Sequence, residues 1–363
     1  MNGGPATGLR ARLEALLTRH WWQPQPTWLA RCLWPLSMVV RAAWLLDRHT
    51  QPPAAALPVP VLVVGNLVVG GAGKTPTVIA VVQALQRAGH RPGVVSRGHG
   101  RQGGAVQAVQ PGDTAARAGD EPLLIQRRCG VPVWVGRRRA DAARALCAAH
   151  PEVDVLVADD GLQHHALQRS AELLVFDERG AGNGWLLPAG PLREPLPATV
   201  PPRSRVLYTA GRASTGLPGA LASRRIDTAL PLAAWQAGEM ASSLASSMSS
   251  SMALAGLAGR PLLAVAGIAA PEKFFTMLRH AGLTIVALPL PDHHPYATLP
   301  WPATTADVIT TEKDAVKLDP RRMGTTRVWV VPLDLQVPAP LLAELSTLLF
   351  PPDSPPRSPS SPT

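Results

Sequence analysis

A glycine-rich segment with one lysine is the part of this 363-residue chain best suited to bind phosphate groups. Residues 65–76 read GNLVVGGAGKTP and follow the apolar run 59–64. Glycines let backbone N–H groups turn toward phosphate oxygens, and a helix that begins directly afterwards adds the positive end of its dipole. Lys74 can reach terminal phosphates, and the Thr75 hydroxyl can contact Mg²⁺. The segment therefore predicts a nucleotide-binding P-loop.

This loop departs from the usual P-loop pattern at one position. The pattern G-x-x-x-x-G-K-[ST] requires glycine at position 68, where this chain has Val68. The sequence instead matches a G-G-x-G-K-T variant, in which Gly70 and Gly71 supply the flexibility. A glycine-rich turn without a ligand is the alternative, which the order of strand, glycines, Lys-Thr and helix disfavours. The predicted nucleotide-binding residues are Gly70, Gly71, Ala72, Gly73, Lys74, Thr75 and Pro76.

Two adjacent acids, Asp159 and Asp160, follow the apolar run 153–158. In P-loop proteins a carboxylate at the end of a buried strand helps to hold Mg²⁺. In an open parallel sheet, ligands bind beyond the carboxyl ends of the strands. We therefore expect Thr75, Asp159 and Asp160 to hold the metal, with a helix N-cap beside a solvated acid as the alternative.

Asp120 precedes the predicted helix 121–128 in the segment GDEP. One interpretation is ordinary helix capping, because Asp and Glu are favoured at helix starts. The other is a carboxylate that faces the γ-phosphate and takes a proton from an attacking hydroxyl.

Arg193 lies in the Gly/Pro-rich segment 182–195, which has no secondary-structure pattern. Long loops of this kind inside a domain are usually functional. We expect Arg193 to contact an anionic substrate or the transferred phosphoryl group.

Two adjacent histidines, His293 and His294, follow Asp292. Neighbouring side chains diverge and no Cys/His cluster lies nearby in the sequence, which disfavours a metal site. A histidine paired with a carboxylate is the favoured interpretation, and a solvated turn is the alternative. The charged side chains of residues 310–317 either line the cleft that binds the ligand or cap a helix, and the sequence does not decide between these two interpretations.

Apolar runs that alternate with helical patterns must position these side chains, and they predict an α/β fold. The pattern indicates a P-loop NTPase-like parallel sheet with helices on both faces, followed by a smaller second α/β/α domain. The first sheet is predicted from strands 59–64, 91–95, 131–135, 153–158, 173–176 and 205–208 and helices 75–88, 121–128 and 138–149. The second unit is predicted from strands 262–266, 284–288, 307–309 and 327–331 and helices 271–281 and 339–349.

Composition divides the chain further. Residues 236–259 are rich in Ser, Ala and Met and predict a flexible insertion, and the Pro/Ser-rich tail predicts disorder. The expected domains are an N-terminal arm (1–50), a P-loop domain (51–232), a low-complexity linker (233–260), a second α/β domain (261–350) and a disordered tail (351–363).

The N-terminal arm combines basic and indole side chains. Residues 9–48 contain six Arg and five Trp, and the apolar stretch 28–46 is interrupted by Arg31, Pro35 and Arg41. A spanning helix needs about 20 nearly uncharged residues, whereas Trp and Arg suit the membrane interface. We therefore favour an amphipathic, membrane-associating helix over ordinary packing on the protein core and over a true span.

The net charge of +10 indicates a polyanionic partner, such as a phosphorylated substrate or an anionic membrane surface. Nucleic acid is not expected as a partner, because only 4% of residues are aromatic and 10 of these are Trp. Three scattered cysteines (Cys32, Cys129 and Cys147) are too few for a disulfide framework or a zinc site and fit a reducing compartment.

Taken together, these segments resemble the tetraacyldisaccharide 4'-kinase (lipid A 4'-kinase) family over about residues 55–335. The motifs that carry the resemblance are VVGNLVVGGAGKTP, GVVSRGHGR, GDEPLL, DDGLQHH, GNGWLLPAGPLREP, AVAGIAAPEKFF, DHHPY and TTEKDAVKL. The resemblance implies transfer of the γ-phosphate of ATP to the 4'-hydroxyl of a tetraacylated glucosamine disaccharide 1-phosphate, with Mg²⁺. It also implies a cleft between two α/β/α domains and the cytoplasmic face of a bacterial inner membrane.

The resemblance also implies roles for matched residues. Lys74 and Thr75 hold phosphates and Mg²⁺, and Asp159 and Asp160 support the metal. Asp120 resembles the catalytic base, His293 its partner from the second domain, and Arg193 a residue that steers phosphate. The alternative is a P-loop GTPase or ATPase that acts as a metal-delivery or assembly switch. A GTPase would favour an N-K-x-D motif, which none of the four lysines forms. Acyl-chain preference and oligomeric state are not predicted.

Overall fold

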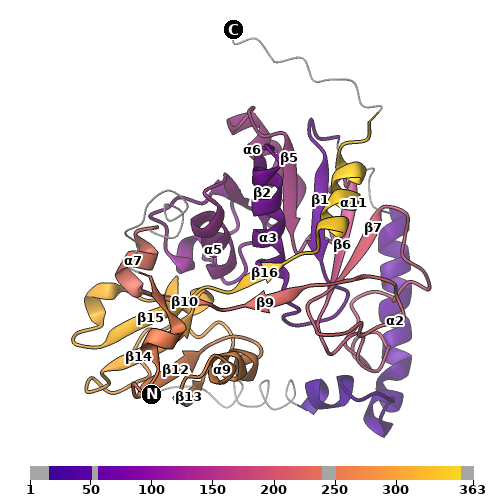
Figure 1. Ribbon diagram of the computed structural model, residues 1–363. Helices are drawn as coiled ribbons and strands as arrows, with labels where there is room; N and C mark the ends of the chain where they lie inside the picture. Colours follow the sequence, from indigo (N-terminus) through magenta and orange to yellow (C-terminus); the bar gives the residue numbers. More distant parts are fainter. Residues whose placement is uncertain (1–15, 51–55, 239–250, 353–363) are drawn as a thin grey trace.

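Two α/β units make up the molecule, and a short ribbon of two strands lies between them (Figure 1). The computed structural model describes residues 16–50, 56–238 and 251–352. The larger unit is an eight-stranded sheet with the order β3-β4-β2-β5-β1-β6-β7-β8. All its strand pairs are parallel except β3 with β4. The predicted α/β fold with a large parallel sheet is therefore confirmed.

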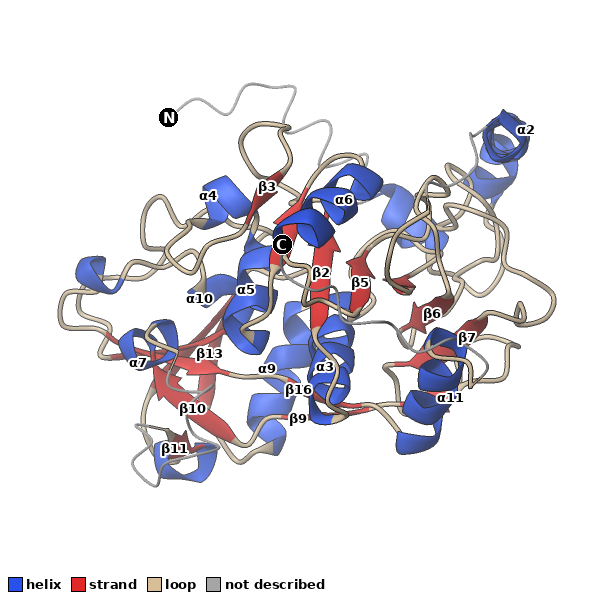
Figure 2. Cartoon of the chain, turned by 90° about the horizontal axis from the view of Figure 1, so that it is seen from above, coloured by secondary structure: helices blue, strands red, loops and turns tan. Residues whose placement is uncertain are grey.

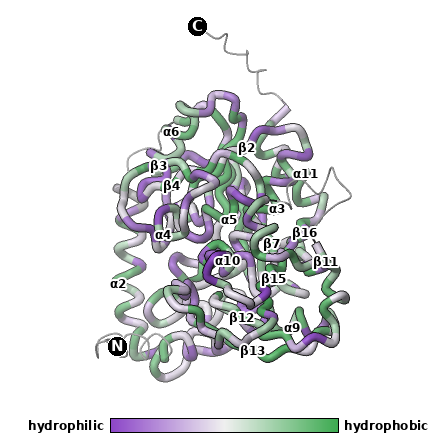
Figure 3. The backbone as a smooth tube through the Cα atoms, turned by 90° about the vertical axis from the view of Figure 1, so that its left-hand side faces the viewer, coloured by the Kyte–Doolittle hydropathy of each residue, from purple (hydrophilic) through white to green (hydrophobic). Residues whose placement is uncertain are grey.

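The central strands of this sheet are fully buried, as expected for parallel strands covered on both faces. The strands are β1 (Val61–Gly65), β2 (Pro92–Ser96), β3 (Gln107–Ala108), β4 (Val133–Val135), β5 (Val155–Asp159), β6 (Ala171–Phe176), β7 (Ser204–Tyr208) and β8 (Ala220–Leu221). Alternate residues of β1, β2, β4, β5, β6 and β7 enter two different apolar clusters, one on each face, and hydrophobic residues are green through the middle of this unit in Figure 3. Helices α3 (Lys74–Arg87) and α5 (Asp120–Cys129) cover one face and α6 (Arg139–Ala149) covers the other.

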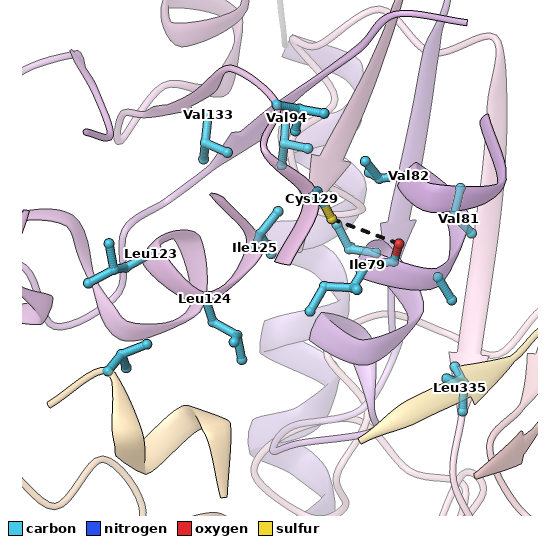
Figure 4. Packing of buried hydrophobic residues seen from close by; sticks show 14 of the residues in the cluster. Ile79, Val81, Val82, Val94, Leu123, Leu124, Ile125, Cys129, Val133 and Leu335 are labelled. Carbon is cyan, nitrogen blue, oxygen red and sulfur yellow. Dashed lines mark hydrogen bonds between the residues drawn. The ribbon is translucent and has the colours of Figure 1, made fainter. Parts of the chain in front are cut away.

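The core beneath α3 and α5 is a close packing of branched side chains (Figure 4). Ile79 and Val82 of α3 face Val94 and Val133 of the sheet together with Ile125 of α5. These two helices carry at their N-termini the residues predicted to do chemistry, so this packing fixes where both helices begin. The short helix α4 (Ala115–Ala118) directly precedes α5.

The smaller unit is a six-stranded sheet with the order β11-β10-β15-β14-β12-β13. Its strands are β10 (Thr228–Pro231), β11 (Met252–Ala253), β12 (Leu262–Ala266), β13 (Ile285–Pro289), β14 (Asp307–Thr311) and β15 (Arg327–Val331). Strands β12 to β15 pair in parallel, while β10 is antiparallel to both of its neighbours. Its helices are α7 (Leu232–Gln236), η1 (Leu254–Leu257), α9 (Pro271–His280), α10 (Glu312–Ala315) and η2 (Pro320–Arg322).

The antiparallel ribbon consists of β9 (Ser223–Arg225) and β16 (Asp334–Gln336), and it carries the chain between the units in both directions. After β16 the chain returns to the larger unit, where α11 (Ala339–Leu349) contacts β6 (Figure 1). We expected this helix within the second unit. It packs on the larger sheet instead, because its buried leucines complete the same apolar cluster as α3. Likewise β10 belongs to the smaller sheet, although residues 51–232 were expected to form the first domain.

The Ser/Met-rich segment forms secondary structure in the part that the structure describes. Residues 239–250 lie outside the described part of the chain, as do residues 353–363 of the predicted tail. Residues 252–257 form β11 and η1, and Leu254 and Leu257 are buried against α9 and its sheet. The expectation of a flexible linker is therefore wrong for this stretch, because its leucines pack into the second core.

Helix α2 (Trp28–Thr50) lies along the outer edge of the larger unit (Figures 1 and 2). One side packs on the protein, where Ala30 and Ser37 are buried. The other side exposes large apolar residues, namely Trp28, Trp34, Leu36, Val39, Leu45 and Leu46. Within the described residues, the stretch Trp28–Asp47 is the one helix long and apolar enough to cross a membrane by length and composition.

Candidate active site

The glycine-rich loop joins the end of β1 to the start of α3, as the P-loop prediction requires. Gly70 and Gly73 have φ angles of 87° and 84°, in the left-handed region that favours glycine. Gly73 directly precedes α3, and a Cβ added to it would lie 3.2 Å from the Thr209 hydroxyl oxygen. The backbone N–H groups at this helix start have no partner within the helix and are available to an anion.

Side chains from outside the loop hold its carbonyl groups. Arg179 Nη2 donates to the carbonyl of Gly71 at 2.6 Å, and the Thr209 hydroxyl donates to the carbonyl of Ala72 at 3.1 Å. Both residues follow the carboxyl ends of neighbouring strands, β6 and β7. With these carbonyls held outward, the loop's N–H groups are left for a ligand. Sequence reasoning missed both residues, because a side chain that binds a backbone carbonyl leaves no motif.

Two side chains, Asn66 and Asp160, hold the ammonium group of Lys74 in place. Its Nζ donates to Asn66 Oδ1 at 2.9 Å and lies 3.4 Å from Asp160 Oδ1. Asn66 also donates to the carbonyl of Gly70 at 3.2 Å. The structure therefore brings together the predicted phosphate-binding lysine and one of the two predicted metal-binding acids, and it adds Asn66, which was not predicted.

Arg193 is placed beside Lys74 by backbone pairing between its loop and the P-loop. The Arg193 N–H donates to the carbonyl of Leu67 at 2.8 Å, and the Val69 N–H donates to the carbonyl of Pro191 at 2.9 Å. The guanidinium Nη1 lies 3.3 Å from Asp160 Oδ1. Lys74 and Arg193 thus both contact the carboxylate of Asp160, so both cations are positioned before a phosphate binds.

The pKa values of Asp159, the last residue of β5, and of Asp160, which follows it, shift in opposite directions. Burial, together with nearby Glu121 and Asp160, raises the pKa of Asp159 to about 7. Ser96 donates to its Oδ2 at 3.0 Å. Burial also acts against the charged form of Asp160, but the charges of Lys74 and Arg193 outweigh it and lower the pKa of this carboxyl.

This arrangement fits a divalent cation. Burial and two nearby carboxyl groups raise the pKa of Asp159, and a bound cation would favour its ionised form. Mg²⁺ is usually held by one or two carboxylates, waters and substrate phosphates rather than by a complete protein cage. Among the described residues, no group of three or more His, Cys, Asp or Glu is arranged to hold a metal ion. Thr75, the third residue predicted to hold the metal, is the second residue of α3.

Asp120 and His293 lie in direct contact although 173 residues separate them. Asp120 begins α5, and His293 follows β13 with a φ of 58°. The Asp120 Oδ2 and His293 Nδ1 atoms are 2.8 Å apart. Burial favours the neutral form of Asp120, but the hydrogen bond from His293 and the charge of Lys313 lower its pKa. The same hydrogen bond raises the pKa of His293 against the effect of burial.

Two lysines from the segment 310–317 surround this pair. Lys313 Nζ lies 3.1 Å from Glu121 Oε1 and 3.4 Å from His293 Nε2. Lys317 Nζ lies 3.9 Å from Asp120 Oδ2. The segment also caps α10, where the Thr311 side chain accepts from the Asp314 N–H. His294 faces the ring of Tyr296 edge-on at 4.9 Å, so it belongs to the packing of its own loop.

A buried ion pair joins the two units at the other end of α5. Arg128, in the last turn of α5, lies 2.6 Å from Glu312, the first residue of α10. Both side chains are buried, and the Trp235 indole donates to Glu312 at 3.1 Å. Helix α5 therefore contacts the second unit at both ends, through Asp120 at its start and Arg128 near its end.

Comparison with known proteins decides the family. A model of the family described as tetraacyldisaccharide-1-P 4'-kinase matches residues 29–349. The chain belongs to the tetraacyldisaccharide 4'-kinase family. It is 51% identical to a tetraacyldisaccharide 4'-kinase of Leptothrix cholodnii over 94% of this chain and 98% of that protein. It is 52% identical to the enzyme of that name from Methylibium petroleiphilum over 96% and 97% of the two chains.

A solved structure shares the fold of this family member. The structure of LpxK from Aquifex aeolicus in complex with ATP matches with a TM-score of 0.67 and 23% sequence identity. The match covers 89% of this chain and all of the Aquifex chain. The resemblance inferred from the motifs is thereby confirmed, while the roles of individual residues stay proposals.

Proposed function

We propose that this family member transfers the γ-phosphate of ATP to the 4'-hydroxyl of a tetraacylated glucosamine disaccharide 1-phosphate, a step of lipid A synthesis. The observation that supports it best is the contact between the buried Asp120 and the half-buried His293, next in the chain to Glu121, which acts on an acid of β5. Glu121 connects the two places, since it follows Asp120 in the chain and acts on the pKa of Asp159. A proton acceptor beside a nucleotide loop suits transfer to an alcohol.

In this proposal the loop and its cations hold ATP, and the buried carboxylate accepts a proton. Lys74 exchanges its contact with Asp160 for the terminal phosphates, and Arg193 neutralises charge on the transferred group. The sugar hydroxyl oxygen attacks the γ-phosphorus, its proton passes to the Asp120 carboxylate, and the bond to ADP breaks. Thr75, Asp159 and Asp160 would hold Mg²⁺, which when bound neutralises charge on the phosphates.

The membrane is the proposed partner surface of α2. Its outward side exposes six large apolar residues, which suits burial at headgroup depth. Its inward side is tied to the larger unit, because the buried Ser37 donates to the carbonyl of Leu186 at 2.9 Å. That polar contact supports a helix that lies on the membrane over one that spans it alone. We place the protein at the cytoplasmic face of a bacterial inner membrane, where an ATP-dependent lipid kinase meets both substrates.

The test of function is direct transfer. The full chain is incubated with γ-labelled ATP, Mg²⁺ and the acylated disaccharide 1-phosphate in mixed micelles. We expect label in the lipid, and none when a 4'-deoxy analogue replaces it. Nucleotide hydrolysis without labelled lipid would instead support the GTPase or ATPase switch, which near full-length similarity to 4'-kinases disfavours.

The test of location uses liposomes of anionic lipid. Replacing Trp34 and Val39 by Glu should release the protein from the vesicles while leaving transfer in detergent intact. Unchanged sedimentation with vesicles would contradict the membrane role of α2.

A further inference from the structure

Lys313 is a buried cation that the proposed chemical step does not yet use. It belongs to α10, and only 19% of its side chain is exposed. Its Nζ lies 3.1 Å from Glu121 Oε1, 3.3 Å from Asp292 Oδ1 and 3.4 Å from His293 Nε2. Two carboxylates from different units thus hold the ammonium group against the far side of the imidazole ring.

The contact with Lys313 allows one arrangement of protons on His293, because the nearest carboxylate oxygen to Nε2, Asp292 Oδ2, lies 3.8 Å away and is too far to accept a hydrogen bond. A lysine ammonium group has three donors and no acceptor, so His293 Nε2 has to accept. A neutral imidazole has one donor and one acceptor, so the proton must then be on Nδ1. Nδ1 faces Asp120 Oδ2 at 2.8 Å, where the ionised carboxylate needs a donor. The lysine and the carboxylate therefore require the same tautomer.

We propose that Lys313 is a positioning residue that holds His293 as the neutral ring with its proton on Nδ1, directed at Asp120. This inference rests on the proposed kinase function. With His293 neutral, the pair carries one net negative charge, located on Asp120. The pair can then accept the proton of the sugar hydroxyl while the new oxygen–phosphorus bond forms and ADP leaves. Lys313 itself transfers no proton.

The charges around His293 oppose one another. Asp120 and Asp292 favour the imidazolium form, and Lys313 disfavours it. Glu121 acts through Lys313, which it holds in place. The remaining groups nearby are Lys317, which faces Asp120, and His99, whose ring centre lies 5.3 Å from that of His293. Because the Asp120 hydrogen bond already raises the pKa of His293, loss of Lys313 removes a charge that limits the rise.

The pH profile of transfer tests this role. In Lys313→Met the pKa of His293 should rise, so the acid limb of kcat should move up by about 1 pH unit. The rate of transfer at pH 6.5 should then fall about 10-fold, and it should recover toward the wild-type rate above pH 8.5. The KM for ATP should stay within about 2-fold of the wild-type value. Lys313→Arg should return the acid limb of kcat most of the way to its wild-type pH. In a His293→Ala background, Lys313→Met should no longer shift the pH of the acid limb.

A spectroscopic measurement separates this inference from the function itself. In the full chain with ¹⁵N-labelled histidine, the His293 signals, assigned with His293→Ala, should show a protonated Nδ1 and an unprotonated Nε2. Lys313→Met should change this pattern toward the imidazolium form at pH 6.5. If wild-type protein transfers phosphate but neither the acid limb nor the ¹⁵N pattern responds to Lys313→Met, the inference is overturned. If wild-type protein transfers no phosphate, the proposed function fails first, whatever the tautomer.

Discussion

The two halves of the site are built in different ways. The half proposed to bind phosphate consists of Lys74, Asp160 and Arg193, all of the larger unit, where both cations contact Asp160. The half proposed to accept the proton joins Asp120 of the larger unit to His293 and Lys313 of the smaller one. A fold can therefore prepare nucleotide binding in one unit and leave the chemical step dependent on how two units meet.

The contacts around each half reflect this difference. The P-loop is fixed by hydrogen bonds to its own carbonyls, from residues that end neighbouring strands. Ion pairs that cross between the units hold α5, which begins at Asp120, against the smaller unit: Lys313–Glu121 next to the pair and Arg128–Glu312 at the other end of the helix. Substitutions in the first half should weaken ATP binding, and substitutions in the second should slow transfer with ATP bound.

The largest effect is expected for Lys74→Ala. It removes the cation placed for the terminal phosphates, so kcat/KM for transfer should fall by about 10³-fold or more, with weaker ATP binding. Transfer kinetics and calorimetric titration with ATP measure both. Arg87→Ala, an exposed cation on the same helix, is the matched control. Full turnover in Lys74→Ala would contradict the proposed role of the P-loop in phosphate transfer.

Asp120→Asn should slow transfer without weakening ATP binding, which distinguishes the two halves of the site. The amide keeps the shape of the side chain but cannot accept the proton, so kcat should fall about 10²–10⁴-fold. The dissociation constant for ATP should stay within about 2-fold. Rapid-quench kinetics at saturating ATP measure the rate. An unchanged rate would refute the assignment of Asp120 as the base.

Arg128→Met should disturb the proton-accepting half from a distance. It leaves Glu312 buried without its partner, which costs about 3–5 kcal/mol in the free energy of unfolding. Urea unfolding measures this loss. In the folded fraction, kcat should fall about 10-fold while ATP binding is retained. The double variant Arg128→Met/Glu312→Leu should recover most of the stability, and a stability loss equal to that of the single variant would contradict the pairing.

The smallest effect is expected for Arg179→Met. This arginine donates to the carbonyl of Gly71 and pairs with Asp177, and its guanidinium lies over the ring of Trp22 at 4.3 Å. Its loss should weaken ATP binding about 3- to 10-fold through a less ordered loop and should leave kcat nearly unchanged. Arg212→Met, at an exposed position, is the control. A fall in kcat without a change in ATP affinity would place Arg179 in the other half.

The sequence was most informative where the signal is local. The P-loop and the strand ahead of Asp159 lie where their glycines and apolar runs predicted, because those patterns act over a few residues. The contact of Asp120 with His293 depends on tertiary structure, and only the family resemblance paired them. The position of α11 was missed because its leucines fit either sheet. Asn66, Arg179 and Thr209 were missed because they bind a lysine and backbone carbonyls, which follow no spacing rule.

The central claim is that Asp120 and His293 act as one proton-accepting unit, apart from the groups that bind ATP. Single-turnover transfer at saturating ATP tests it in Asp120→Ala, His293→Ala and the double variant. The account predicts that the double variant is about as slow as Asp120→Ala alone and that all three bind ATP as the wild type does. Rate losses that multiply in the double variant, or a matching loss of ATP affinity, would contradict it.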